Sequence, residues 1–153
     1  MIQEKVHVTP VRIDFDLLDA GNVVYHPNYL ILCDRARAQA FDDAGYPAHE
    51  MWKDGVALAL VETLTHYKSP AMMGQNLAIA TRLLDFQRVS LFVEQKLFLT
   101  EQTIKSGYLE EWDDSQAKKI LFDAKIKLVC VSVNPLKVTA FPSRLASALM
   151  LNS

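Results

Sequence analysis

A carboxylate and a helix start lie close together in one short segment of the chain. Asp19 begins a turn, and Gly21 and Asn22 follow it as the two residue types that best tolerate a positive φ angle. Pro27 then suits the first position of a helix, because its missing N–H would have no helical partner there. N–H groups at a helix start stabilise negative charge, and a nearby carboxylate can act as base or nucleophile. The segment therefore suits attack on a carbonyl carbon.

Two residues of this segment are candidates for catalysis, and each also has a structural interpretation. Asp19 could activate water or attack a carbonyl directly, or it could bond only to the backbone of its own turn. His26 lies seven residues after Asp19, where its N–H group could polarise a carbonyl oxygen with the help of the helix dipole. A side-chain role of His26 as acid or base, or a role as helix cap, stays open. We predict catalytic roles for both residues.

Three stretches of the sequence resemble the hotdog-fold acyl-CoA thioesterases. The stretch "DAGNVVYHPNYLILCDRARAQAF", which starts at Asp19, is similar to the signature of the 4-hydroxybenzoyl-CoA thioesterases and of the acyl-CoA thioesterases associated with the Tol–Pal system. The stretch "ALVETLTHYKSPAMMGQNLAI" resembles their second strand, Y-x-x-P turn and third strand. The stretch "LFDAKIKLVCVSVNPLKVTAFP" resembles their last strand and its exit. The resemblance covers about residues 6–145, with Asn22 in place of a glycine that many relatives carry.

The resemblance implies a fold and a set of site residues. The fold is an α+β hotdog, in which a five-stranded antiparallel sheet wraps a long central helix and dimerises through the sheet. Asp19 is the implied essential carboxylate, as base or nucleophile. The N–H of His26, with those of Asn28 and Tyr29, is the implied oxyanion site. Substrate contacts are predicted for Tyr25, Asn28, Tyr29, Arg88 and Ser90.

The resemblance also implies a substrate and an assembly. The substrate is an acyl thioester of CoA or of an acyl carrier protein, and the reaction needs no cofactor. Ser90 falls where relatives carry Ser or Thr near the thioester, and Arg88 is one of several basic residues that could bind the phosphates of CoA. The protein is expected to form a homodimer or homotetramer with active sites at subunit interfaces. Nothing in the sequence selects an aromatic, short aliphatic or long acyl group.

Two other functions remain as alternatives. A hotdog-fold dehydratase or hydratase would need a His-Phe-Pro motif and an acid on the central helix, whereas His26 is followed directly by Pro27. A non-catalytic acyl-thioester binding protein would keep the fold but would not need Asp19. The complete motif from Asp19 to Tyr29 therefore favours a thioesterase.

Composition restricts the remaining function classes. The 153 residues suit one domain spanning 1–153, and a net charge of −2 provides no electrostatic footprint for nucleic acid. An 18-residue apolar run and a signal-peptide pattern are both missing, which predicts no membrane insertion and a cytoplasmic location. Cys33 and Cys130 stand alone in apolar surroundings and are expected to be buried thiols. The scattered histidines have no metal-ligand spacing, so we predict no metal site.

Hydrophobic periodicity indicates one long helix followed by strands. The helix is predicted over 28–44, with Gly45 at its end. Its apolar stripe comprises Tyr29, Leu32, Cys33, Ala36, Ala40, Phe41 and Ala44. Strands are predicted over 6–15, 56–67, 77–86, 89–99 and 120–133, with a short terminal helix over 143–151. Together these elements form an α+β domain whose helix packs on one sheet face.

Several local features lead to more specific expectations. Pro10 should place the first strand at a sheet edge or a bulge, and 49–55 should be a polar connection. The apolar first half of 56–67 suits a strand covered on both faces, and 100–118 suits a hairpin tip outside the core. Arg37 lies within the helix stripe and needs a partner, for which an interface ion pair is expected. Exposed sheet edges favour pairing with a second copy.

Overall fold

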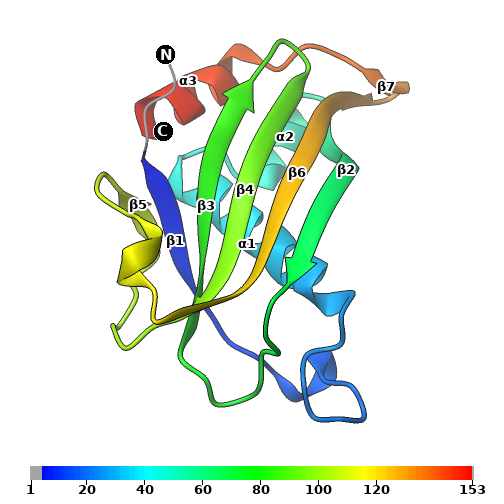
Figure 1. Ribbon diagram of the computed structural model, residues 1–153. Coiled ribbons are helices and arrows are strands. Elements are labelled where there is room, and N and C mark those ends of the chain that lie inside the picture. Colours follow the sequence, from blue (N-terminus) through cyan, green and yellow to red (C-terminus); the bar gives the residue numbers. More distant parts are fainter. Residues whose placement is uncertain (1–4, 153) are drawn as a thin grey trace.

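One antiparallel sheet forms the frame of the protein (Figure 1). The computed structural model describes residues 5–152. Within this range the long strands are β1 (Val6–Val11), β2 (Val56–Tyr67), β3 (Leu77–Phe86), β4 (Ser90–Leu99) and β6 (Lys119–Val133), and the short ones are β5 (Gly107–Leu109) and β7 (Leu136–Val138). The strand order is β2-β6-β4-β3-β1-β5, and β7 pairs with β6. The predicted α+β hotdog architecture is confirmed, with short β5 and β7 added to the expected sheet.

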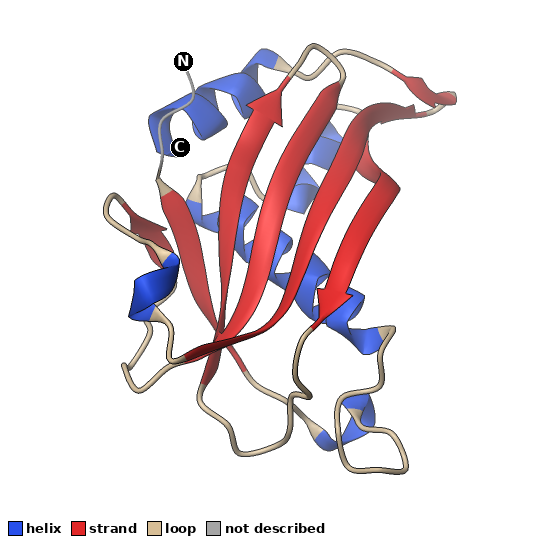
Figure 2. Ribbon diagram, viewed as in Figure 1, coloured by secondary structure: helices blue, strands red, loops and turns tan. Residues whose placement is uncertain are grey.

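The sheet curves around α1 (Asn28–Asp43), which crosses one of its faces (Figure 2). The buried side chains of α1 belong to the predicted stripe, with the addition of Arg37: Tyr29, Leu32, Cys33, Ala36, Arg37 and Ala40. Gly45 follows the helix with a φ of +85°, a conformation that few other residues adopt. The predicted helix is thus confirmed to within one residue. Cys33 and Cys130 are both buried and free, as expected.

The main core lies between α1 and the sheet. Many of its deeply buried side chains come from β3, β4 and β6: Leu77, Ile79, Leu91, Leu97, Phe122 and Ile126. Burial of each such side chain contributes about 1.5–3 kcal/mol to stability. This core therefore holds α1 firmly on the sheet, and with it the helix start that follows the Asp19 turn.

The segment 100–118 packs on the sheet, so the prediction of a hairpin tip outside the core is wrong. β5 pairs with β1, and Trp112 is only 8% exposed where its ring packs against Phe98. This segment helps to cover a second apolar cluster on the outer sheet face: Val6, Val8, Ala78, Ala80, Phe98 and Trp112. A single tryptophan among polar residues produces no periodic pattern, so the local sequence did not indicate this packing.

Two further boundaries differ from those predicted. β1 ends at Val11 instead of residue 15, because a 3-10 helix (Phe15–Leu17) takes up the chain that leads to the Asp19 turn. The expected polar connection over 49–55 instead contains α2 (Ala48–Lys53). Pro10 lies beyond the three residues of β1 that pair with β5, so its position at a sheet edge is confirmed.

β2 is an edge strand of the sheet, and the exposure of its side chains contradicts the prediction that both of its faces are covered. It pairs with β6 on one side, and no other strand of residues 5–152 pairs with it. Its apolar side chains are open to solvent in the single chain, with Leu60 45%, Val61 52% and Leu64 58% exposed. Natural proteins commonly cover or pair an apolar edge of this kind.

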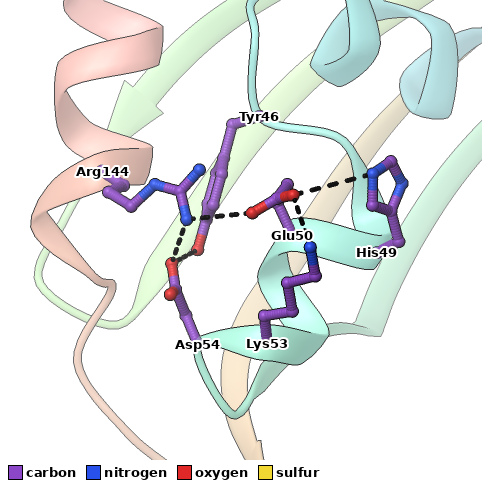
Figure 3. Close-up of polar contacts among 6 residues, drawn as sticks. All are labelled: Tyr46, His49, Glu50, Lys53, Asp54 and Arg144. Atoms are coloured by element: carbon purple, nitrogen blue, oxygen red, sulfur yellow. Dashed lines mark hydrogen bonds and ion pairs between the residues drawn. The ribbon is translucent and has the colours of Figure 1, made fainter.

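α3 (Ser143–Asn152) is fastened to α2 by one arginine (Figure 3). The Arg144 guanidinium donates to Glu50 Oε2 at 3.2 Å and to Asp54 Oδ2 at 3.4 Å, and it lies 4.9 Å from the centre of the Tyr46 ring. The Tyr46 hydroxyl donates to Asp54 at 2.6 Å, and burial together with this bond raises the pKa of Tyr46. The cluster holds α3 against the end of the chain segment that precedes β2. No helix in residues 5–152 is long and apolar enough to span a membrane.

Candidate active site

Asp19 sits in a tight hairpin turn. Its N–H donates to the Val23 carbonyl at 2.9 Å, and the Asn22 N–H donates back to the Asp19 carbonyl at 3.1 Å. Asn22 has a φ of +63°, as expected from its tolerance of the left-handed region. The Gly21 N–H donates to Asp19 Oδ1 at 2.8 Å, and a Cβ on Gly21 would lie 3.2 Å from that oxygen. Glycine at this position therefore lets the backbone approach the carboxylate closely.

In this geometry Asp19 caps the turn through only one of its two carboxylate oxygens. Oδ1 is held by the Gly21 N–H, whereas Oδ2 makes no hydrogen bond to any residue of the described part of the chain. The side chain is exposed to solvent. The turn-capping and the catalytic interpretations of Asp19 are thus compatible, because one oxygen orients the group and the other stays available.

The chain returns from this hairpin into the start of α1. The Tyr25 N–H and the Asn28 side-chain amide both donate to the Leu17 carbonyl, at 3.0 and 2.9 Å. Pro27 already has helical angles, with φ −69° and ψ −21°. The Asn28 N–H donates to the Tyr25 carbonyl at 2.8 Å, so this predicted oxyanion donor is already engaged. Among residues 5–152 neither the His26 N–H nor the Tyr29 N–H has a hydrogen-bond partner, so these two predicted donors remain available, and that of His26 lies before the helix at the end of the hairpin.

Tyr29 links the helix start to the loop between β2 and β3. Its buried hydroxyl accepts from the Ala71 N–H at 3.0 Å, while the Ala71 carbonyl accepts from the Val24 N–H at 2.9 Å. Burial raises the pKa of the Tyr29 hydroxyl, and the charges of Tyr67 and Asp19 raise it further against the opposing bond from Ala71. Tyr29 therefore stays a neutral hydroxyl within electrostatic range of the Asp19 carboxylate.

Tyr67 is a member of this site that the sequence did not single out. Its hydroxyl donates to the His26 carbonyl at 2.9 Å, and its ring meets the His26 and Tyr29 rings edge-on. The available signal is the Y-x-x-P turn that Tyr67 opens, which by itself indicates a turn after a strand and no contact with the helix start. The segment 19–29 and the end of β2 thus form one structural unit at the lower end of the sheet in Figure 1.

Residues 13–149 match the family model of the thioesterase-like superfamily. The chain belongs to this superfamily. The matched range includes the Asp19 hairpin, α1 and the strands β2 to β7, whereas β1 lies before it. The match confirms the resemblance seen in the sequence.

Named relatives within the thioesterase group extend over nearly the whole chain. The acyl-CoA thioester hydrolase YbgC of Escherichia coli O6:H1 is 25% identical over 138 residues, which are 90% of this chain and 91% of that protein. The acyl-CoA thioesterase YbgC of Haemophilus influenzae is 26% identical over 140 residues, with 91% and 90% covered. The crystal structure of Slr0204, a 1,4-dihydroxy-2-naphthoyl-CoA thioesterase from Synechocystis, aligns with a TM-score of 0.76 at 17% identity, with 94% and 95% covered. This structural likeness supports the hotdog fold.

Two of the predicted substrate contacts lie elsewhere in this member of the thioesterase-like superfamily. Ser90 is buried at the first residue of β4, and Arg88 is exposed in the preceding turn, at the upper end of the sheet in Figure 1. Since β4 is 10 residues long, its two ends lie about 30 Å apart at roughly 3.3 Å per residue. The structure brings together Asp19, Tyr25, His26, Asn28 and Tyr29, and within one chain it does not bring Ser90 or Arg88 to them.

Arg37 finds its partners inside the chain, so no interface ion pair is needed to explain it. Its guanidinium donates to Gln95 Oε1 at 2.8 Å and to Asp34 Oδ1 at 3.1 Å. Gln95 in turn donates to the Cys33 carbonyl and to Thr81 Oγ1, both at 3.0 Å. Burial lowers the pKa of Arg37, and Asp34 opposes this shift. The residue is therefore part of a buried network that locks α1 to β4.

Proposed function

We propose that this chain, an acyl-CoA thioesterase, hydrolyses its substrate with Asp19 as general base or nucleophile and with the His26 N–H as oxyanion donor. One observation carries the proposal. The hairpin that orients the Asp19 carboxylate through Gly21 runs directly into a helix start whose His26 N–H is unpaired within residues 5–152. Both groups that acyl transfer requires are therefore presented by one short and well-braced segment.

The reaction follows from these two groups. Water attacks the thioester carbonyl while Asp19 takes its proton, or the carboxylate attacks first and water then cleaves the resulting anhydride. In both routes negative charge develops on the carbonyl oxygen, where the His26 N–H and the positive end of α1 stabilise it. In the general-base route the C–S bond breaks when the tetrahedral intermediate collapses, whereas in the nucleophilic route it breaks when the anhydride forms, before water attacks. In both routes the leaving thiolate takes up a proton, and the products are the free acid and the thiol. CoA is the thiol carrier in the names of both YbgC relatives, and an acyl carrier protein is the second carrier to be tested.

We also propose that the working form is a dimer, or a pair of dimers, joined through the β2 edges. The support is the exposed apolar edge formed by Leu60, Val61 and Leu64. A two-fold axis between two β2 strands makes them antiparallel, so the two sheets run in opposite directions. The Ser90 end of one sheet then lies level with the Asp19 end of the other, so a site shared by two chains would unite both sets of predicted residues.

Hydrolysis of an acyl-CoA is the direct test of this function. Purified protein should release free thiol from at least one member of a panel of aromatic, short aliphatic and long-chain acyl-CoA substrates, and the same acyl groups on a carrier protein test the second carrier. Thiol release is followed with a chromogenic thiol reagent. Hydration of an enoyl-CoA without thiol release would support the dehydratase alternative, and tight binding without turnover would support a binding protein.

The helix start provides a second test. His26→Tyr should keep substantial activity, because the proposed role belongs to the backbone N–H and the exposed imidazole is dispensable. Pro27→Gly should lose more, because a loosened helix entry misplaces a donor worth about 3 kcal/mol, or roughly a hundredfold in rate. Both variants are compared at saturating substrate, with thermal unfolding as the control for folding. A folded but inactive His26→Tyr would instead assign the chemistry to the imidazole.

A further inference from the structure

The His26 carbonyl is held by a side chain from a distant strand. The Tyr67 hydroxyl, 41 residues away in sequence, donates to this carbonyl at 2.9 Å. Within residues 5–152 no N–H group of α1 donates to the His26 carbonyl, since the Leu30 N–H donates to the Pro27 carbonyl at 3.2 Å instead. The first turn of α1 is therefore positioned at His26 by a tertiary contact and not by the regular helical bond pattern.

Tyr67 is itself fixed on a rigid base. It is the last residue of β2 and pairs in register with Phe122 of β6. The two N–H groups that follow, those of Lys68 and Ser69, both donate to the Leu121 carbonyl at 2.9 and 3.0 Å. The Tyr67 ring packs edge-on against the rings of Tyr29 and Phe122, with centroid distances of 5.2 and 5.0 Å. These contacts direct the hydroxyl at the His26 carbonyl, although Tyr67 itself is 48% exposed.

The carbonyl and the N–H of one residue are joined through only two backbone dihedral angles. The φ angle of the next residue is also restricted, because that residue is Pro27. Holding the His26 carbonyl from one side therefore restricts the direction of the His26 N–H on the other. A donor to a developing oxyanion must be pre-positioned to be effective.

We propose that Tyr67 is a positioning residue that sets the oxyanion donor of the thioesterase through its bond to the His26 carbonyl. The inference rests on the proposed function of the His26 N–H. Because the His26 N–H stabilises charge that develops only in the transition state, Tyr67 affects the stability of the transition state and not the affinity for the substrate. Its loss should therefore lower kcat and leave KM nearly unchanged, since an interaction made only in the transition state is removed.

Tyr108 of β5 supplies a matched control, because it binds a carbonyl of the same helix. Its hydroxyl donates to the Ala40 carbonyl at 2.8 Å, close to the C-terminal end of α1. Tyr108→Phe removes the same kind of bond, from a tyrosine hydroxyl to a carbonyl of α1, far from the helix start. Any general weakening of α1 should appear in this variant as well.

The experiment compares Tyr67→Phe, Tyr108→Phe and the wild-type protein on the best acyl-CoA substrate. Tyr67→Phe should lower kcat by about ten- to a hundredfold, as expected for a misplaced donor, with KM within about twofold. The shape of its kcat–pH profile should match that of the wild type, because a positioning residue transfers no proton. Tyr108→Phe should keep wild-type kcat, and both variants should unfold at similar temperatures.

Three outcomes would overturn the positioning role. These are an unchanged kcat in Tyr67→Phe, an equal loss in Tyr108→Phe, and the loss of an alkaline limb that the wild-type profile has, which would place the Tyr67 hydroxyl in proton transfer. If the wild-type protein hydrolyses no acyl-CoA, the proposed function fails and this inference fails with it. If Asp19→Asn is inactive and Tyr67→Phe is fully active, only the inference about Tyr67 fails.

Discussion

Asp19→Asn is expected to lower kcat by at least about a hundredfold, the size of effect expected for loss of a positioned acid–base group. The asparagine side chain keeps an oxygen that can accept from the Gly21 N–H, which now binds Asp19 Oδ1 at 2.8 Å. The turn and the entry into α1 should therefore survive. Steady-state thiol release measures the loss, and the thermal unfolding temperature measures the fold.

Asp16→Asn is the matched control for this prediction. Asp16 is an exposed carboxylate on the same approach to the hairpin, and it lies only three residues before Asp19. Asp16→Asn removes the same charge near the hairpin as Asp19→Asn does. Because Asp16 has no proposed part in the reaction, kcat should stay close to the wild-type value. If folded Asp19→Asn keeps more than a tenth of the wild-type activity on the best substrate, Asp19 is not the essential carboxylate.

The parts of the fold that follow from local patterns were predictable from the sequence. α1 was predicted over 28–44 and spans Asn28–Asp43, because its apolar stripe has the helical period and Gly45 ends it. The predicted ranges 56–67 and 77–86 match β2 and β3. The left-handed Asn22 followed from residue type alone. In each case the decisive information lies within a few neighbouring residues.

The parts that depend on long-range contacts were not predictable in this way. The apolar run of β2 correctly indicated a strand, but the expected cover on both faces is wrong, because the place of β2 at the sheet edge depends on strand order, which no local pattern contains. Trp112 closes the outer face through a contact with Phe98 of β4. Tyr67 reaches His26 across 41 residues. Such pairs become visible only when the topology brings distant strands and turns together.

Arg37 illustrates how a correct requirement can be met by partners that the sequence did not indicate. A charged group in an apolar stripe must be paired, and the sequence rightly required this. The partner is Gln95 of β4, assisted by Asp34 on the helix itself, so the residue carries no evidence for a dimer. The case for assembly therefore depends on the β2 edge alone, and a variant in that edge is the appropriate test.

Val61→Asp is expected to convert the protein into a folded but inactive monomer. Val61 is 52% exposed at the bulge of β2, so the aspartate stays in water in the single chain. In a β2–β2 interface the same carboxylate would be buried without a partner, at a cost of several kcal/mol. A cost of about 4 kcal/mol weakens association by roughly a thousandfold. Activity should fall with the fraction of dimer, because the proposed site needs both chains.

Light scattering and activity measured over a range of protein concentrations check this prediction together. Activity of Val61→Asp should rise more steeply than the protein concentration, since mass action restores the dimer, whereas direct damage to the site would leave specific activity constant. Leu109→Asp is the matched control, because Leu109 is 39% exposed on β5 at the opposite edge of the sheet. It should keep the wild-type assembly and rate. A Val61→Asp monomer with full activity at micromolar concentration would show that each chain carries a complete site, and Ser90 and Arg88 would then have no part in it.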